Sequence, residues 1–198
     1  MVYNFFAAIS RMKYIERWAL MRNSRAETLS EHSLEVAMIA HALSTIGNVR
    51  YGHRMDAGKA ALIGIYHDAS EIITGDMPTP VKYYNSDIRD AYKDVEHIAS
   101  DRLLSKLPDD LKDEFTGILG KSEDDPEESY MRKLVKAADK LSALIKCMEE
   151  RQSGNSEFRT AENSIRKKID DLSREYPEVR DFMEEFLPAY GRTLDELS

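Results

Sequence analysis

Residues 60–71 read AALIGIYHDASE and give the first indication of the fold class. Residues 60–66 are apolar on nearly all faces, which predicts a helix that is buried throughout. His67 and Asp68 follow at once, and a charged aspartate at the end of a buried helix is unfavourable unless it is paired or binds a metal. Glu71 comes four residues after His67 and three after Asp68, so a helix places it on the adjoining face. Three acid or imidazole groups therefore gather at one helix end.

The sequence on either side has the same helical character. No Asn-Gly or Asp-Gly turn lies between alternating apolar runs, so β-hairpin signals are missing. Thr28 and Glu31 have the spacing of a capping box, which predicts a helix start. We expect an all-α, compact single-domain helical bundle over residues 1–198, with its motif-bearing core at about 28–150. Helices are predicted at about residues 3–16, 30–47, 57–73, 86–106, 109–119, 127–152, 156–174 and 177–189.

Composition and charge exclude several classes of protein. The chain has 198 residues, of which 42% are hydrophobic, and a formal net charge of -8. This acidic balance argues against binding of a nucleic-acid polymer, which requires a broad basic surface. The single cysteine, Cys147, makes neither an internal disulfide nor a cysteine-rich zinc site. Because we find neither an apolar run of about 20 residues nor a secretion signal, we expect a soluble cytoplasmic protein with no membrane partner.

Two further residues extend the polar group at the helix end. His32 shares a helix face with Val36, so its imidazole is expected to point inward. Asp139 has small apolar neighbours on its own helix face, and an inward aspartate there requires a partner. Together with His67 and Asp68, these residues offer a mixed nitrogen and oxygen set that suits Mn, Co, Fe, Ni or Zn. From the residues alone, separate buried polar networks are an equal alternative to a metal site.

A positively charged segment interrupts this acidic chain at residues 11–25. It has one glutamate, Glu16, among five basic residues. Such a cluster is either a solvated face or a small anion site, and its sequence does not separate the two. The basic residues are Arg11, Lys13, Arg17, Arg22 and Arg25.

The order His32…His67-Asp68…Asp139 resembles the H…HD…D signature of the HD-domain metal-dependent phosphohydrolases. Longer segments are similar to the bacterial HD-domain 5′-deoxynucleotidases, and the similarity runs over nearly the whole chain. The resemblance implies the all-α HD-domain fold and hydrolysis of deoxyribonucleoside 5′-monophosphates to deoxynucleoside and phosphate, with ribonucleotides rejected. The segments that carry it are residues 17–23 (RWALMRN), 30–34 (SEHSL), 66–71 (YHDASE) and 75–83 (GDMPTPVKY).

The same resemblance implies a cofactor and an assembly. One divalent metal ion, with Co²⁺ or Mn²⁺ favoured, is expected to be held by His32, His67, Asp68 and Asp139. Glu71 is expected to transfer protons, as base toward the attacking water. Its alternative role is to accept a hydrogen bond that orients His67. Members of the family form dimers, so a homodimer is expected.

Two residues near the N-terminus are implied to contact the substrate. Arg17 matches the residue that contacts the phosphate, and a planar guanidinium suits the paired oxygens of that group. Trp18 matches the contact to the nucleoside. Without the resemblance, a core anchor is the simpler interpretation of this tryptophan, the only one in the chain.

A proline-stiffened loop is implied to grip the sugar. Asp76 is expected to accept a hydrogen bond from the 3′-hydroxyl, while the loop crowds the 2′ position. Asp68 and Asp139 are also expected to face the substrate. The expected catalytic set is Glu71, Asp68 and Arg17, and the loop residues are Asp76, Met77, Pro78 and Thr79.

Two other functions stay open at this point. One is another HD phosphohydrolase that acts on cyclic nucleotides, alarmones or nucleoside triphosphates, although a triphosphatase is expected to surround its pocket with more basic residues. The other is a non-catalytic helical binding module in which the HD cluster is structural. A panel of phosphorylated nucleosides, assayed for phosphate release, separates these functions.

Overall fold

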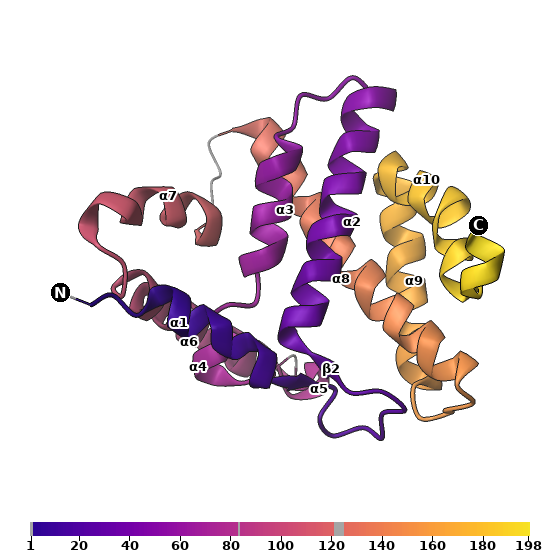
Figure 1. The fold of residues 1–198 in the computed structure, drawn as a ribbon, viewed down its shortest axis with the longest axis horizontal. Coiled ribbons are helices and arrows are strands. Elements are labelled where there is room, and N and C mark those ends of the chain that lie inside the picture. The colour runs from indigo at the N-terminus through magenta and orange to yellow at the C-terminus, as the bar shows by residue number, and fades with distance from the viewer. Residues whose placement is uncertain (1, 83, 121–124) are drawn as a thin grey trace. The chain divides into compact units, whose positions relative to one another are not determined.

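The structure is a computed structural model that describes residues 2–82, 84–120 and 125–198 (Figure 1). Helices dominate it, which confirms the predicted all-α class. The elements are α1 (Phe5–Ile9), η1 (Ser10–Tyr14), β1 (Glu16–Arg17), β2 (Glu27–Thr28), α2 (Leu29–Arg50), α3 (Ala57–Tyr66), α4 (Glu71–Thr74), α5 (Thr79–Lys82), α6 (Ser86–Leu104), α7 (Asp109–Leu119), α8 (Pro126–Gln152), α9 (Arg159–Glu175), α10 (Pro177–Glu185), η2 (Leu187–Gly191) and η3 (Leu194–Leu197).

The start of α2 follows the predicted capping box. The backbone N–H of Thr28 donates to Glu31 Oε2 at 2.8 Å, and the backbone N–H of Glu31 donates to Thr28 Oγ1 at 3.3 Å. These bonds satisfy N–H groups that have no partner within the helix. The box therefore fixes the first turn of α2, where His32 lies.

The helix predicted over residues 57–73 is wrong in one respect, because α3 ends at Tyr66 and α4 begins only at Glu71. Between them the backbone forms tight turns, in which Ala69 N–H donates to the carbonyl of Tyr66 at 3.0 Å and Glu71 N–H to that of Asp68 at 2.9 Å. Ala69 is fully buried in a hydrophobic core. Its burial in this tight turn outweighs the helical propensity of the apolar segment.

A small antiparallel ladder was not expected either. β1 and β2 pair Glu16 with Thr28 and Arg17 with Glu27. The two strands are joined by residues 18–26, a connection much longer than the two-residue turns that make hairpins recognisable in a sequence. The ladder is short, and its importance lies in the side chains that it aligns.

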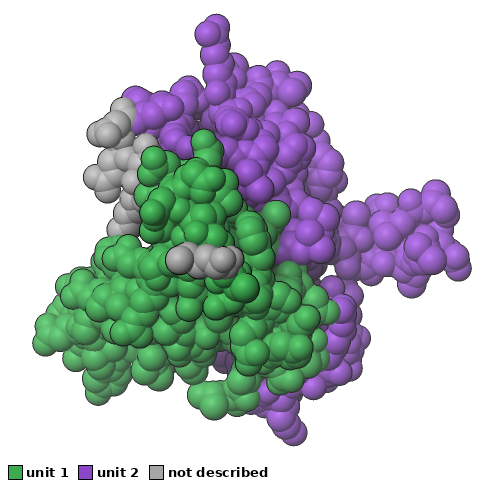
Figure 2. All heavy atoms as spheres, turned by 60° about the vertical axis from the view of Figure 1, so that its left-hand side comes forward, with its two compact units in different colours: residues 1–20, 26–33, 65–121 green, residues 21–25, 34–64, 122–198 purple. Residues whose placement is uncertain are grey.

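The chain folds into two compact units, each assembled from separate segments (Figure 2). The first unit comprises residues 1–20, 26–33 and 65–121, and the second comprises residues 21–25, 34–64 and 122–198. Segment 21–25 therefore belongs to the second unit, although both strands that flank it belong to the first. A single domain over residues 1–198 stays a prediction.

The core of the first unit lies under the turn after α3. Phe5, Ala69, Leu103 and Leu107 are buried together. Phe115 packs edge-on against Phe5, with ring centroids 4.9 Å apart. Ala69, the residue after Asp68, is part of this core. Its burial fixes the turn between α3 and α4 that carries His67 and Asp68.

The core of the second unit is centred on α8, which packs against α9 (Figure 1). Buried residues recur along α8 at helical spacing, among them Leu134, Leu141 and Leu144. α2 and α3 approach closely at Gly64, where an added Cβ would lie 2.7 Å from the Cα of Ala37.

Within the described ranges, we find no helix with the length and apolar character to cross a membrane.

Candidate active site

Three predicted metal ligands lie together in the first unit. His32 Nε2 is 3.7 Å from Asp68 Oδ2, and His67 Nε2 is 3.0 Å from the same oxygen. One ligand atom from each residue falls within 4.8 Å of the other two. Ligand atoms that share a first-row metal ion at about 2.0–2.2 Å lie roughly 3–4 Å apart, so the distances from the two imidazoles to Asp68 Oδ2 fit one divalent ion.

The three side chains of the cluster differ in how far they are buried. His32 is fully buried, whereas the side chains of His67 and Asp68 are 16% and 24% exposed. The cluster is thus closed on the side of α2 and open on the side of the turn after α3. A site that binds both a metal ion and a substrate needs such an opening.

Glu71 lies beside these ligands at the start of α4 and is buried. Burial, together with the nearby carboxylates of Asp68 and Asp76, raises the pKa of Glu71 to about 9, although the positive charges of Lys82 and Arg17 oppose the rise. Within the described part of the chain, its Oε2 has no hydrogen-bond partner. A buried carboxyl group beside two others, with one oxygen unsatisfied, fits a nearby cation or an exchangeable proton.

The ladder aligns Arg17 and Trp18 on one carboxylate. Arg17 Nη1 donates to Glu27 Oε2 at 2.7 Å, and Trp18 Nε1 donates to the same oxygen at 3.2 Å. The Arg17 guanidinium lies 5.7 Å from the centroid of the indole ring. Glu27 was missed in the sequence, because an acidic residue ten positions after an arginine follows no local spacing rule.

Trp18 is not a core anchor. Its side chain is only half-buried, and its φ of 58° lies in the left-handed region that larger side chains rarely adopt. Of the described residues other than glycine, it is the only one with a positive φ. Such strain persists where surrounding contacts hold it, and it often accompanies a functional role.

The carboxylate of Asp76 interacts both with the Arg17–Trp18 segment and with Asp68 of the metal-ligand cluster. Burial raises the pKa of Asp76 above its ordinary range, while Arg17 and the backbone N–H of Trp18, which donates to this carboxylate, lower it. Asp68 raises the same pKa, so the two carboxylates lie in one electrostatic environment. The predicted phosphate, nucleoside and sugar contacts are thereby gathered around the ligand cluster in one unit.

Met77, Pro78 and Thr79 follow Asp76 in the loop that is predicted to grip the sugar. Met77 and Pro78 are half-buried, and the carbonyl of Pro78 accepts the backbone N–H of Val81 at 2.8 Å, which closes the first turn of α5. The side chain of Thr79 lies outside the described part of the structure. Its role at the sugar stays a prediction.

Asp139, the fourth predicted ligand, lies on α8 in the second unit. Its side chain is 24% exposed, and the ammonium of Lys140 donates to its Oδ2 at 2.7 Å. Val135 and Ala143, its neighbours on the same helix face, are buried, whereas Asp139 itself is half-buried and not fully inward as expected. Its role as fourth metal ligand stays a prediction.

This helical fold is that of the HD-domain phosphohydrolases. The structure superposes on the HD-domain phosphohydrolase of Listeria innocua with a TM-score of 0.80, at 24% identity over 94% of this chain and 88% of that chain. A cyanophage S-2L HD phosphohydrolase, DatZ, solved with dA and one catalytic Zn²⁺ ion, matches with a TM-score of 0.64, at 16% identity over 94% of this chain and 96% of that chain.

Sequence comparison narrows the class to one family. The family described as 5′-deoxynucleotidase YfbR-like matches residues 4–190, and the chain belongs to this family. A 5′-deoxynucleotidase of Enterobacter sp. (strain 638) is 47% identical over 195 residues, which are 98% of this chain and 96% of the relative. The family resemblance noted in the sequence is therefore confirmed over nearly the whole chain.

Proposed function

We propose that this chain is a metal-dependent 5′-deoxynucleotidase, which hydrolyses deoxyribonucleoside 5′-monophosphates to deoxynucleoside and phosphate. The observation that carries the proposal is the partly buried cluster of His32, His67 and Asp68, set in the same unit as Arg17 and Trp18. Relatives at 47% identity that are named 5′-deoxynucleotidases support the substrate class.

One divalent ion is the cofactor that we propose, held by His32, His67, Asp68 and Asp139. Two imidazoles and two carboxylates suit Co²⁺ and Mn²⁺, and also Zn²⁺, the ion named for the cyanophage protein of the same fold. When bound, such an ion supplies positive charge that polarises the phosphoryl group and acidifies a water molecule.

The protein's own groups then position the substrate and move protons. The water oxygen bonds to phosphorus as the P–O5′ bond breaks. Glu71, whose ionised form a bound cation would favour, accepts the proton that this water loses and passes it to the departing O5′, so the products are phosphate and a deoxynucleoside. Arg17 holds the phosphate oxygens, and Trp18 contacts the nucleoside. Asp76 accepts a hydrogen bond from the 3′-hydroxyl, and the family resemblance assigns the rejection of a 2′-hydroxyl to the loop of Met77, Pro78 and Thr79.

The setting of the enzyme is also part of the proposal. A net charge of -8 supports a small-molecule substrate over a nucleic-acid polymer. A homodimer and a cytoplasmic location are proposed on the family resemblance and on the sequence alone. Size-exclusion chromatography with light scattering tests the first, and fractionation of the source cells tests the second.

Metal removal followed by a substrate panel tests the function. The protein is stripped with a chelator, reloaded with Mn²⁺, Co²⁺ or Zn²⁺, and assayed for phosphate release. Release from dAMP and dTMP but not from AMP, and only after reloading, is expected. Preferential turnover of cyclic AMP, an alarmone or a nucleoside triphosphate would assign another HD phosphohydrolase. Metal binding with no release from any substrate would assign a binding module.

A further inference from the structure

A buried ion pair in the second unit lies outside the residues assigned so far. Lys146 and Glu150 are one helical turn apart on α8, and their side chains are only 4% and 1% exposed. The ammonium of Lys146 also lies 5.6 Å from the centroid of the buried Phe158 ring. A buried ion pair offsets its desolvation cost only when further hydrogen bonds satisfy both charged groups. The other hydrogen-bond partners of Lys146 and Glu150 therefore show what the pair stabilises.

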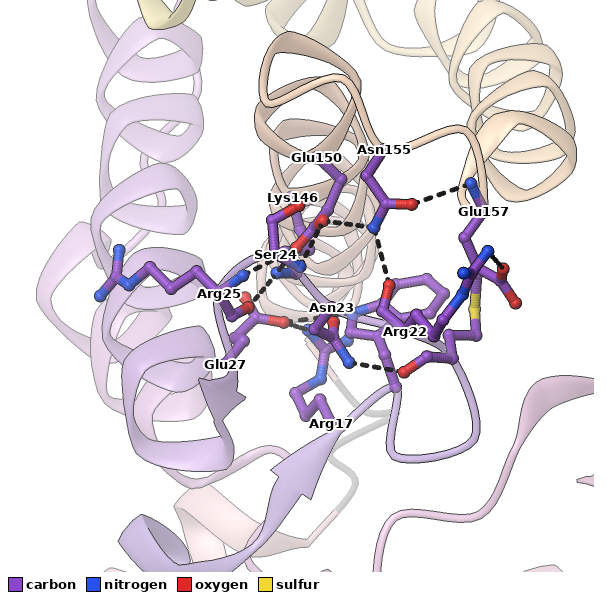
Figure 3. A network of polar contacts seen from close by, with 12 residues as sticks. Arg17, Arg22, Asn23, Ser24, Arg25, Glu27, Lys146, Glu150, Asn155 and Glu157 are labelled. Atoms are coloured by element: carbon purple, nitrogen blue, oxygen red, sulfur yellow. Dashed lines mark hydrogen bonds and ion pairs between the residues drawn. The ribbon is translucent and has the colours of Figure 1, made fainter.

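Those partners are backbone groups of segment 21–25 (Figure 3). The Glu150 carboxylate accepts the backbone N–H of Ser24 at 2.8 Å and that of Arg25 at 3.4 Å. Lys146 Nζ donates to the carbonyl of Arg25 at 2.6 Å. The pair therefore holds the segment by donor and acceptor groups at once, and these contacts do not depend on the side chains of the segment.

Asn155 adds a further contact just after the end of α8. Its Nδ2 donates to the backbone carbonyl of Arg22 at 2.7 Å and to Glu150 Oε2 at 2.7 Å (Figure 3). Burial disfavours a charged Glu150, but the hydrogen bonds from Lys146, Ser24 and Asn155 outweigh it and hold the pKa of Glu150 at about 2. Glu150 is thus ionised and fully hydrogen-bonded near neutral pH.

The segment held in this way is the middle of the connection between β1 and β2. Three residues before it comes Trp18, and two residues after it comes Glu27, whose carboxylate binds Trp18 and Arg17. Only two residues separate this segment from Trp18, and only one separates it from Glu27. Fixing the backbone of the segment therefore also restricts the positions that Trp18 and Glu27 can take.

α8 carries one further residue with a proposed role, Asp139. Lys146 and Glu150 follow Asp139 by seven and eleven residues, so the three share one face of a single helix. They are spaced by roughly 10 and 16 Å along its axis. One rigid helix thus carries a predicted metal ligand and, about three turns further on, the anchor of the substrate connection.

We propose that the Lys146–Glu150 pair is a positioning site for the nucleotide, which sets affinity for the deoxynucleotide by fixing the connection that presents Arg17 and Trp18. The pair touches neither substrate nor metal ion in this role. The inference rests on the proposed function, because it assumes that Arg17 and Trp18 bind the substrate.

The test uses Glu150→Gln in the full chain, with Glu128→Gln as the matched control. Glu128 is also a carboxylate on α8 that binds two cations, Arg132 and Lys59, but these lie outside segment 21–25. Trp18 is the only tryptophan, so quenching of its fluorescence by acrylamide reports on the connection without any turnover. Steady-state kinetics on dAMP and Mn²⁺ titration by calorimetry complete the measurement.

Glu150→Gln is expected to raise Trp18 quenching at least twofold and the KM for dAMP about tenfold, with kcat changed less than threefold and Mn²⁺ affinity unchanged. Glu128→Gln is expected to match the wild type in all four. A folded Glu150→Gln protein with wild-type quenching and KM would overturn the proposal. Absence of deoxynucleotidase activity in the wild type would instead overturn the proposed function, while the quenching still reports on the connection.

Asn155→Ala decides the matter if Glu150→Gln does not fold. It removes the Asn155 bonds to the carbonyl of Arg22, to Glu150 Oε2 and to the backbone N–H of Glu157, and it keeps the Lys146–Glu150 ion pair. A smaller rise in both quenching and KM, by about threefold in KM, supports the positioning role. Wild-type quenching and KM in this variant would overturn it.

Discussion

Glu27 accepts a hydrogen bond of 2.7 Å from the guanidinium of Arg17, the residue opposite to it in the β1–β2 ladder. Both side chains are nearly buried, with 13% and 11% of their surface exposed. The same Glu27 oxygen also accepts the indole N–H of Trp18. The groups proposed to bind phosphate and nucleoside therefore share one anchor, and their mutual orientation exists before the substrate arrives.

Glu27→Gln is expected to raise the KM for dAMP about tenfold and to change kcat less, because an amide replaces the charge-assisted bonds that orient both groups. Steady-state phosphate release at saturating Mn²⁺ measures both constants. Glu16→Gln is the control, since Glu16 lies on the same strand with its side chain exposed. Equal KM values in the two variants would contradict the shared-anchor role.

Glu71→Gln is expected to lower kcat by about 10²- to 10⁴-fold and to leave the metal content intact, because an amide of the same shape cannot take a proton from water. Single-turnover phosphate release measures the rate, and elemental analysis measures the metal. Full activity would remove Glu71 from proton transfer. A parallel loss of metal would assign it instead to the orientation of His67.

The ligand cluster could be predicted from the sequence because its evidence is local. His67 and Asp68 are adjacent at the end of an apolar helix, and the capping box at Thr28 sets the start of the helix that contains His32. Each signal depends on periodicity and on the free energy of burying a charge. The break after Tyr66 was missed because burial of Ala69 is a tertiary effect that helix periodicity does not contain.

The role of Glu150 could not be predicted for a similar reason. A lysine and a glutamate four residues apart are typical of a solvated helix face, and the sequence gives this pair no other mark. Both are buried because segment 21–25, more than 100 residues earlier in the chain, lies on them. Contacts over such separations leave no periodic pattern in the sequence.

Thr79→Gly is expected to admit AMP as a substrate and to lower the preference for dAMP about tenfold, because the sugar loop then leaves room at the 2′ position. The ratio of kcat/KM for dAMP and AMP measures the preference. Val81→Ala is the control, since it truncates an exposed side chain of the same short helix, α5. Unchanged sugar selectivity in Thr79→Gly would count against this loop as the discriminator.

Gly64→Ala is expected to destabilise the protein by about 1–3 kcal/mol, because the added Cβ would lie 2.7 Å from the Cα of Ala37 and force α2 and α3 apart. Urea unfolding measures the change in free energy. Gly117→Ala is the control, since a Cβ there meets no atom within 4 Å. Equal stability of the two variants would show that the two helices can separate without strain.

The stability contributed by Glu150 is expected to depend on pH. Burial opposes ionisation, but the bonds from Lys146 and Ser24 lower the pKa of Glu150 from an ordinary 4.5 to about 2 in the folded chain. The contribution is therefore fully present above the unfolded pKa and is lost as the pH falls toward about 2.

Urea unfolding of the wild type and Glu150→Gln between pH 7 and pH 3 measures this dependence. The difference in their free energies of unfolding is expected to be constant above about pH 5 and to shrink steadily below it. Glu149→Gln, at the exposed neighbouring position, is expected to show a much smaller difference over the whole range. A Glu150→Gln difference that stays constant down to pH 3 would mean that the carboxylate is no more acidic in the folded chain than in the unfolded one, and its bonds to segment 21–25 would then contribute no net preference for the ionised form.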